Sequence, residues 1–131
     1  MKNIIIDTSC VLAVVLNEPG KTSIIQKTEE TFLLAPESLS WEIGNALSAM
    51  FKKERLSLKD ARVAWHAAQQ ILIRFVYPNM ERALEIAQEQ GIYAYDAYML
   101  AASEEYRAPL LTLDMQLRRC ARSLNLKLVE V

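Results

Sequence analysis

The chain has 131 residues, of which 52 % are hydrophobic and 24 % charged, and its formal net charge is −1 at pH 7. This composition supports a folded core and excludes an intrinsically disordered chain. It also excludes a strongly basic nucleic-acid binder, although a local basic patch can still attract a polyanion. We find no linker, repeat or low-complexity segment, and we therefore expect a single domain over residues 1–131.

The first sixteen residues, MKNIIIDTSCVLAVVL, superficially resemble a signal peptide. Asp7 interrupts the apolar run, however, and residues 17–19 make a poor cleavage site. No apolar run reaches the ~18 residues that a membrane helix needs. With only two cysteines, Cys10 and Cys120, reduced thiols are the simplest expectation. We therefore expect a cytoplasmic protein without a membrane segment.

Short apolar or β-branched runs alternate with longer helical patterns along the chain. In chain order we expect a strand at 2–6, helices at 9–16 and 21–30, a strand at 31–36, helices at 37–54 and 57–74, a brief strand or extended connection at 74–78, helices at 79–90 and 95–107, a strand at 109–113, a helix at 115–124 and a strand at 126–131. Ser57 is expected to cap the helix at 57–74, and Gly91 to end the helix at 79–90. This alternation predicts an α/β fold, a three-layer α/β/α sandwich with a mostly parallel central sheet.

Four acidic residues are candidates for a site at one edge of this sheet. Asp7 ends the first strand and Asp114 follows the strand at 109–113, so parallel pairing brings them to the same edge. Helical periodicity places Asp96 on the inner side of its helix. Glu42 lies beside an apolar stripe, and Asn45, one turn further along, can reach the same space.

Each acid also has a purely structural explanation. Asp7 and Asp114 can cap helices, Asp96 suits the dipole of its helix, and Glu42 can extend to water. Four converging carboxylates, in contrast, raise one another's pKa and are stable as anions mainly around a cation. Oxygen ligands without a Cys/His set of zinc spacing favour Mg²⁺ or Mn²⁺.

Four segments carry a resemblance to a known family: IIIDTS, WEIGNAL, YDAYMLAAS and LLTLDMQL, in this order. Together they resemble the PIN domain, and more narrowly the VapC-type toxins of bacterial and archaeal toxin–antitoxin pairs. The resemblance spans essentially the whole chain. It implies a metal-dependent endoribonuclease that hydrolyses RNA phosphodiester bonds, typically in single-stranded or loop regions. It also implies a cognate antitoxin protein and a homodimer.

The same resemblance assigns roles to residues. The acidic quartet, expected to be catalytic and to bind Mg²⁺ or Mn²⁺, comprises Asp7, Glu42, Asp96 and Asp114. Flanking polar residues, expected to hold carboxylates or the scissile phosphate, comprise Thr8, Ser9, Asn45 and Thr112. Metal ions would then activate water, neutralise the phosphate and stabilise the leaving oxygen.

Basic and aromatic residues are candidates for holding RNA. Clusters at 51–55 and 116–122 supply positive charge, and Arg118 follows Asp114 closely, although a solvated helix face explains them equally well. Five aromatic residues can stack bases: Trp41, Trp65, Tyr93, Tyr95 and Tyr98. For these we favour core or interface packing, with Tyr95 as an exception because it neighbours Asp96.

Other acidic α/β sites fit less well. A haloacid-dehalogenase-type phosphatase would carry a second aspartate where Ser9 stands. A response-regulator receiver would carry paired acids near the first strand and a phosphoacceptor aspartate near the middle of the chain. The remaining alternative is a non-catalytic PIN-like module that binds RNA or a protein, although a pure binder has no need of four mutually repelling acids.

Overall fold

Four parallel strands form the central sheet of the computed structural model, which describes residues 1–131. They are β1 (Lys2–Ile6), β2 (Thr31–Pro36), β3 (Ile73–Val76) and β4 (Leu110–Leu111), and their order in the sheet is β3-β2-β1-β4. The predicted parallel sheet is confirmed. The isoleucines of β1 lie in the interior of the sheet, between β2 and β4, where a continuous apolar run is expected.

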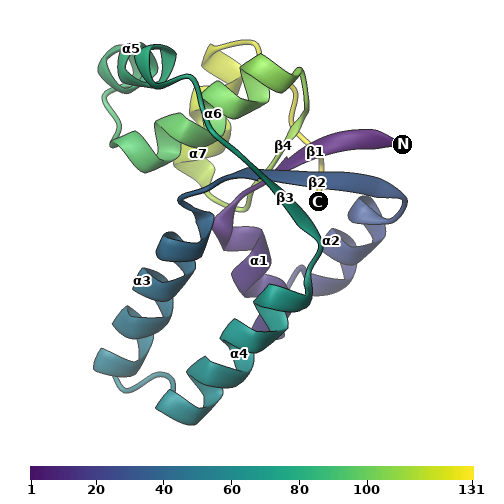
Figure 1. Cartoon of the computed structure of the whole chain (residues 1–131), viewed down its shortest axis with the longest axis vertical. Coiled ribbons are helices and arrows are strands. Elements are labelled where there is room, and N and C mark those ends of the chain that lie inside the picture. The colour runs from purple at the N-terminus through teal and green to yellow at the C-terminus, as the bar shows by residue number, and fades with distance from the viewer.

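Seven helices cover the two faces of the sheet (Figure 1). They are α1 (Thr8–Val15), α2 (Lys21–Thr28), α3 (Leu39–Lys52), α4 (Leu58–Gln70), α5 (Met80–Gln90), α6 (Ala94–Tyr106) and α7 (Met115–Ser123). On one face α1 packs against α2, α3 and α4, whereas on the other α6 packs against α5 and α7. The three-layer α/β/α sandwich is therefore confirmed.

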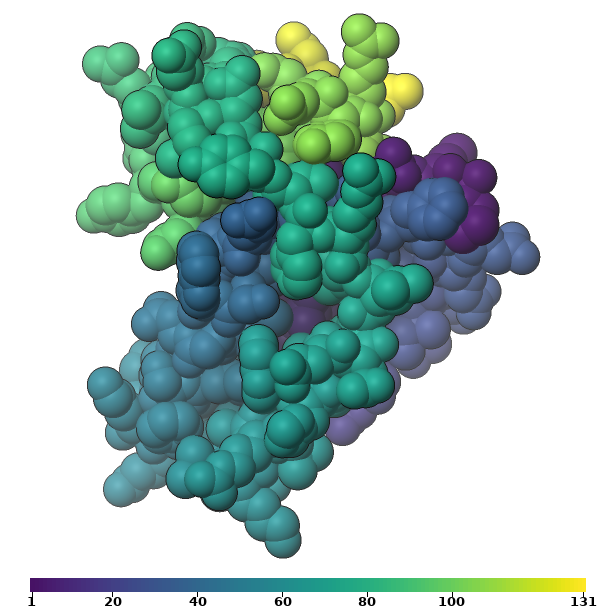
Figure 2. All heavy atoms as spheres, viewed as in Figure 1, coloured from purple at the N-terminus to yellow at the C-terminus, as the bar shows by residue number.

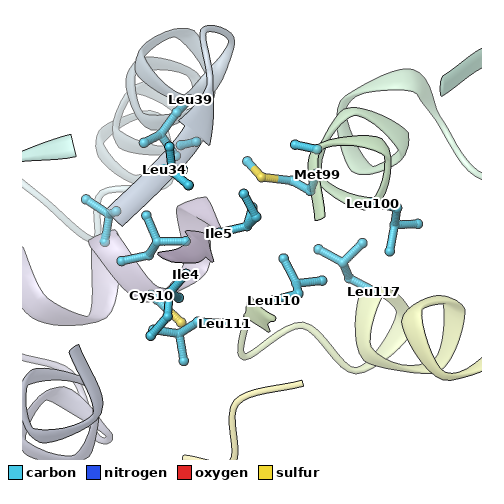
Figure 3. Close-up of a cluster of buried hydrophobic side chains, with 14 of the residues drawn as sticks. Ile4, Ile5, Cys10, Leu34, Leu39, Met99, Leu100, Leu110, Leu111 and Leu117 are labelled. Carbon is cyan, nitrogen blue, oxygen red and sulfur yellow. The ribbon is translucent and has the colours of Figure 1, made fainter. Parts of the chain in front are cut away.

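The core lies where the sheet meets both layers of helices (Figure 3). Ile5 of β1 and Leu110 of β4 are fully buried, between Leu39 of α3 on one side and Leu100 and Leu117 of α6 and α7 on the other. This packing holds β1 and β4 together, and so fixes the edge of the sheet at which both strands end.

The end of the chain differs from the prediction. Residues 126–131 form no strand, because only Leu128 makes an isolated bridge, to Leu110. The strand predicted at 109–113 is also shorter, since β4 contains only two residues. A two-residue strand offers too few backbone groups for a full fifth strand to pair with, and the prediction at 126–131 is wrong for this reason.

The predicted helix ends agree with the structure at two positions. Ser57 Oγ accepts a hydrogen bond from the backbone N–H of Asp60 at 3.0 Å. Gly91 ends α5 with φ of +64°, a left-handed conformation that glycine adopts at little cost. None of the seven helices combines the length and apolarity needed to cross a lipid bilayer.

A hollow of about 260 Å³ opens between α3, α4 and β3, on the face of the molecule shown in Figure 2. Its walls include Ile43 of α3, Trp65 of α4 and Phe75 of β3. Trp65 is partly buried and packs against the core, as predicted for this residue.

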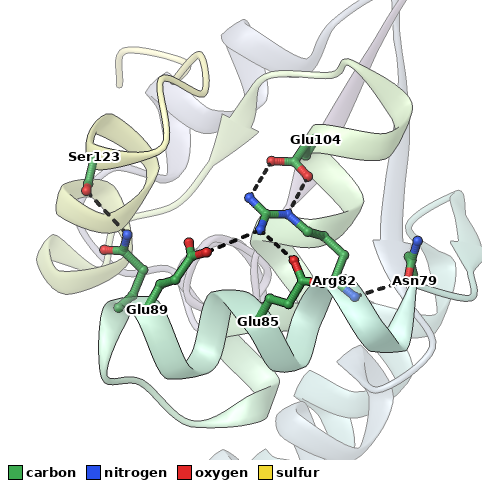
Figure 4. A network of polar contacts seen from close by, with 7 residues as sticks. Asn79, Arg82, Glu85, Glu89, Glu104 and Ser123 are labelled. Atoms are coloured by element: carbon green, nitrogen blue, oxygen red, sulfur yellow. Dashed lines mark hydrogen bonds and ion pairs between the residues drawn. The ribbon is translucent and has the colours of Figure 1, made fainter.

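Hydrogen bonds from Arg82 join α5 to α6 (Figure 4). Arg82 donates from Nε to Glu104 Oε1 at 2.7 Å and from Nη2 to Glu104 Oε2 at 3.2 Å. Its Nη1 also donates to Glu85 at 3.1 Å, and lies 3.6 Å from a carboxylate oxygen of Glu89. The paired contact with Glu104 is the geometry in which an arginine binds a carboxylate best.

Replacing Arg82 with alanine is expected to lower the free energy of unfolding by about 1 kcal/mol, because a partly exposed ion pair contributes little more than this. Arg82→Ala, Glu104→Ala and the double variant should be compared by urea denaturation, with the exposed Arg62→Ala as the control. The effects of the two single changes should not add. Additive losses would mean that the contact contributes nothing to stability.

Candidate active site

Asp7 stands at the carboxyl end of β1 and begins α1. The neighbouring pair Ile6 and Leu111 is in register between β1 and β4, and the Asp7 N–H donates to the Leu111 carbonyl at 3.0 Å. Its side chain accepts from the backbone N–H of Ser9 at 3.4 Å and so caps α1. The predicted capping role is confirmed. With only 5 % of Asp7 exposed, capping alone does not explain why a charged group is buried here.

Two hydroxyl groups hold this carboxylate in place. Thr112 Oγ1 donates to Asp7 Oδ2 at 2.7 Å, and Ser9 Oγ donates to the same oxygen at 2.8 Å. These hydroxyls in turn accept from backbone N–H groups, Ser9 from Leu113 and Thr112 from Asp114, both at 3.0 Å. All hydrogen bonds of the carboxylate converge on Oδ2, so that Oδ1 keeps no partner within the protein.

The other acids each begin a different helix. Glu42 and Asp96 lie in the first turns of α3 and α6, and both are half-buried. Asp114 caps α7, accepting from the Leu117 N–H at 2.9 Å, and its side chain is exposed. β1 and β4 are neighbouring parallel strands, as predicted; Asp7 directly follows β1, whereas Thr112 and Leu113 separate Asp114 from the end of β4.

The acids influence one another electrostatically. Burial raises the pKa of Asp7, and the hydrogen bonds from Thr112 and Ser9 oppose this shift. Burial and then the charge of Asp7 raise the pKa of Glu42 to about 7. The pKa of Asp96 is raised by burial and by the charges of Asp7 and Asp114. Asp7 therefore lies near enough to both Glu42 and Asp96 to raise their pKa values, and Asp114 lies near enough to Asp96 to do the same.

Ser38 is a residue of the candidate site that the sequence analysis missed. Its buried hydroxyl donates to Glu42 Oε2 at 3.1 Å, one helical turn away, and opposes the rise of the Glu42 pKa. The spacing of four residues at the start of a helix was the available signal. One carboxylate oxygen of Glu42 is held by Ser38, and the Thr8 side chain also interacts with this carboxylate and opposes the rise of its pKa.

An open hollow of about 420 Å³ adjoins Glu42. Asn45 lines it together with Glu42, which agrees with the prediction that these side chains reach the same space. Thr8 also lines it; its Oγ1 is buried and makes no well-formed hydrogen bond, although its side chain lies near enough to Glu42 to lower the pKa of that residue. Trp41 and Tyr95 complete the walls. Trp41 is 68 % exposed, so it does not pack in the core, and interface packing stays a prediction for this residue.

Arg118 has partners within the protein. Its Nη1 donates to the Thr112 carbonyl at 3.2 Å, and its Nη2 pairs with Glu130 at the same distance. Only 12 % of its side chain is exposed. The arginine therefore stabilises the segment that contains Thr112. Its predicted contact with RNA would require the ion pair between Arg118 and Glu130 to break.

The donor set fits a hard divalent cation, although no three acidic side chains lie close enough together to coordinate one metal ion. All candidate ligands are oxygens, and the hydrogen bonds to Asp7 from Ser9 and Thr112 all reach Oδ2 and leave Oδ1 available. Mg²⁺ usually keeps several waters and binds through one or two carboxylates, so a cage of three is not required. The Thr8 hydroxyl adds a further polar group in the same region.

Replacing Thr112 with valine is expected to lower the free energy of unfolding by about 1–3 kcal/mol, because it removes a buried donor and leaves Asp7 with one hydroxyl bond fewer. Thr112→Ser keeps the hydroxyl and should retain most of the stability. Urea denaturation at neutral pH measures both. Equal losses in the two variants would assign the effect to packing rather than to the hydrogen bond.

The raised pKa of Glu42 predicts that the metal-free protein loses stability as the pH rises. The folded state binds the Glu42 proton more tightly than the unfolded state, whose pKa is near 4.5, so stability falls between this value and about 7. Glu42→Gln cannot ionise and should lose less stability over this interval, measured by urea denaturation in EDTA. Glu81→Gln, in the exposed first turn of α5, is the control and should behave as the wild type.

Two solved structures have similar folds. PAE2754 from Pyrobaculum aerophilum is 22 % identical, with a TM-score of 0.72 over 91 % of this chain and 86 % of that one. VapBC2 from Rickettsia felis, bound to a DNA fragment from their promoter, contains a chain that is 12 % identical, with a TM-score of 0.65 over 97 % of both. A comparison with curated proteins finds no match.

The comparison with protein families gives a direct assignment. The model described as the PIN domain matches residues 4–123, a range that includes all four acids and both hydroxyls bonded to Asp7. The fold and the family model agree with the resemblance seen in the four sequence segments. The chain therefore belongs to the PIN domain family.

Proposed function

We propose that this protein is a Mg²⁺- or Mn²⁺-dependent endoribonuclease that hydrolyses RNA phosphodiester bonds at the acidic site. The observation that carries the proposal is the buried Asp7 carboxylate, which has one oxygen held by two hydroxyls and the other without a partner. A carboxylate oriented in this way, with further acids around it, favours binding of a cation over a purely structural role.

Each acidic residue would have its own role in metal binding or catalysis. Asp7, Asp96 and Asp114 would bind the metal, while Glu42 would bind it directly or orient a water molecule. A divalent cation at such a site activates water, neutralises the phosphate and stabilises the leaving oxygen. The pKa of Glu42, about 7 in the metal-free protein, would fall when a cation binds, so that Glu42 would act as a carboxylate there. Ser9 and Thr112 keep Asp7 oriented, and Thr8 and Asn45, which line the hollow beside Glu42, would contact the substrate.

We further propose that the protein is the toxin of a toxin–antitoxin pair, acts in the cytoplasm as a homodimer and is restrained by a cognate antitoxin. The four sequence segments and the fold that it shares with VapBC2 of Rickettsia felis support this proposal. Both cysteines are free and buried, which suits a reducing compartment.

Purified protein is expected to cut end-labelled RNA in Mg²⁺ or Mn²⁺ and to lose all cutting in EDTA. Asp7→Asn should lower the cleavage rate by at least about 100-fold, since loss of groups that only orient metal ligands already costs 10- to 100-fold. Asparagine is also a good helix cap, so α1 should remain intact. Asp60→Asn, an acid in the first turn of α4, is the matched control and should cut as the wild type does.

The outcomes separate the candidate functions. Cutting that resists EDTA, or that Asp7→Asn retains, would assign the activity to a contaminant or to another site. Binding of RNA without cutting of varied RNAs in either metal would instead favour a non-catalytic PIN-like module. No three acidic side chains lie close enough together to hold a metal ion, and this observation favours the second candidate.

A further inference from the structure

Trp41 is a large apolar side chain that the fold leaves unpacked. It lies in the first turn of α3, immediately before Glu42, and 68 % of it is exposed. Burying an aromatic ring is strongly favourable, so an exposed tryptophan beside a candidate active site indicates a surface that a ligand covers. The helix itself does not need the ring there, because Leu39, Ile43 and Leu47 form its buried face.

Trp41 is shared by two neighbouring hollows. The first, of about 420 Å³, is lined by Thr8, Glu42, Asn45 and Tyr95 in addition to Trp41. The second, of about 250 Å³, lies on the side of β2 and β3 where these strands end, and Tyr77 and Tyr98 contribute to its walls. The tryptophan therefore stands between two cavities, and each of them contains further aromatic rings.

The aromatic rings of the two hollows are in contact. Tyr95 from the first and Tyr98 from the second lie edge to face, with centroids 5.9 Å apart and an interplanar angle of 81°. Tyr98 packs against the core, whereas Tyr95 is 52 % exposed and Tyr77 is 70 % exposed. The partly buried ring of Tyr98 thus links the exposed ring of Tyr95 in the first hollow to the walls of the second.

The polar groups in the first hollow suit a nucleobase. The exposed Asn45 side-chain amide lines this hollow and offers both a donor and an acceptor. An apolar protein helix would leave this amide unpaired. A base, in contrast, presents a flat face to an aromatic ring and hydrogen-bonding groups at its edge.

We infer that the two hollows on either side of Trp41 bind successive unstacked bases of single-stranded RNA, next to the bond that is cut. This inference rests on the proposed function, because the acidic site fixes where the RNA backbone must pass. Stacking on aromatic faces supplies affinity that depends little on sequence. It also accounts for RNA binding by a chain whose formal net charge is −1. Paired bases in a duplex cannot enter such hollows, so the site selects single strands.

The test measures binding separately from cutting. In the Asp7→Asn background, a fluorescently labelled single-stranded RNA of mixed sequence is titrated and its anisotropy recorded. Trp41→Ala should weaken binding about 10-fold or more, and Trp41→Tyr should restore most of it. Phe32→Ala is the matched control, since Phe32 is 55 % exposed but lies near the opposite end of β2, and it should bind as the background does.

The fluorescence of Trp41 supplies a second readout. With Trp65 replaced by phenylalanine, Trp41 is the only tryptophan, and stacking of a base on it should quench its emission. Single-stranded RNA should quench strongly, and a duplex of the same sequence should not. Equal quenching by both, or equal binding by Trp41→Ala and the background, would overturn the inference.

These outcomes are distinct from those of the proposed function. Metal-dependent cutting together with Trp41-independent binding would leave the nuclease intact and remove the base-binding surface. Trp41-dependent binding without any cutting would support the base-binding surface, contradict the nuclease and favour a non-catalytic RNA-binding module. Absence of binding by every variant would overturn the inference directly.

Discussion

The burial of one carboxylate is the constraint on which the rest of this site depends. Asp7 ends a strand in the interior of the sheet and is almost inaccessible to water, a position where a charge is costly unless several groups compensate it. The compensation comes from Ser9 and Thr112, whose own oxygens are held by backbone N–H groups of the segment after β4. The pairing of β1 with β4 is therefore as necessary to the site as the acids themselves.

The orientation of four helices partly offsets the electrostatic repulsion between the acids. Asp7, Glu42, Asp96 and Asp114 stand at the N-terminal ends of α1, α3, α6 and α7. The positive end of each helix dipole favours an anion by about 0.3–1 kcal/mol. This partly offsets the like-charge repulsion, but burial still raises the pKa values of Asp7, Glu42 and Asp96, and neighbouring charges add to the rise for Glu42 and Asp96. A positive charge near these acids would oppose that rise.

Much of this arrangement could be predicted from local patterns. Apolar runs that end in Asp7 and Asp114, with helices between them, were sufficient to place both acids at one edge of a parallel sheet. Contacts that depend on distant segments were not predictable. The pairing of Arg118 with Glu130, the missing strand at 126–131 and the exposure of Trp41 all depend on which neighbours the folded chain supplies. Periodicity describes one helix or strand at a time and contains no information about these neighbours.

The hydrogen bond between Thr112 and Asp7 joins residues that are 105 positions apart in the chain. A ribosome that has synthesised the first strands and helices has produced the Asp7 carboxylate but not the hydroxyl that orients it. The acidic centre therefore cannot assemble during most of translation, because β4 must emerge and pair with β1 first. If the protein cuts RNA as proposed, this order of synthesis would delay the orientation of Asp7 until most of the chain has been made.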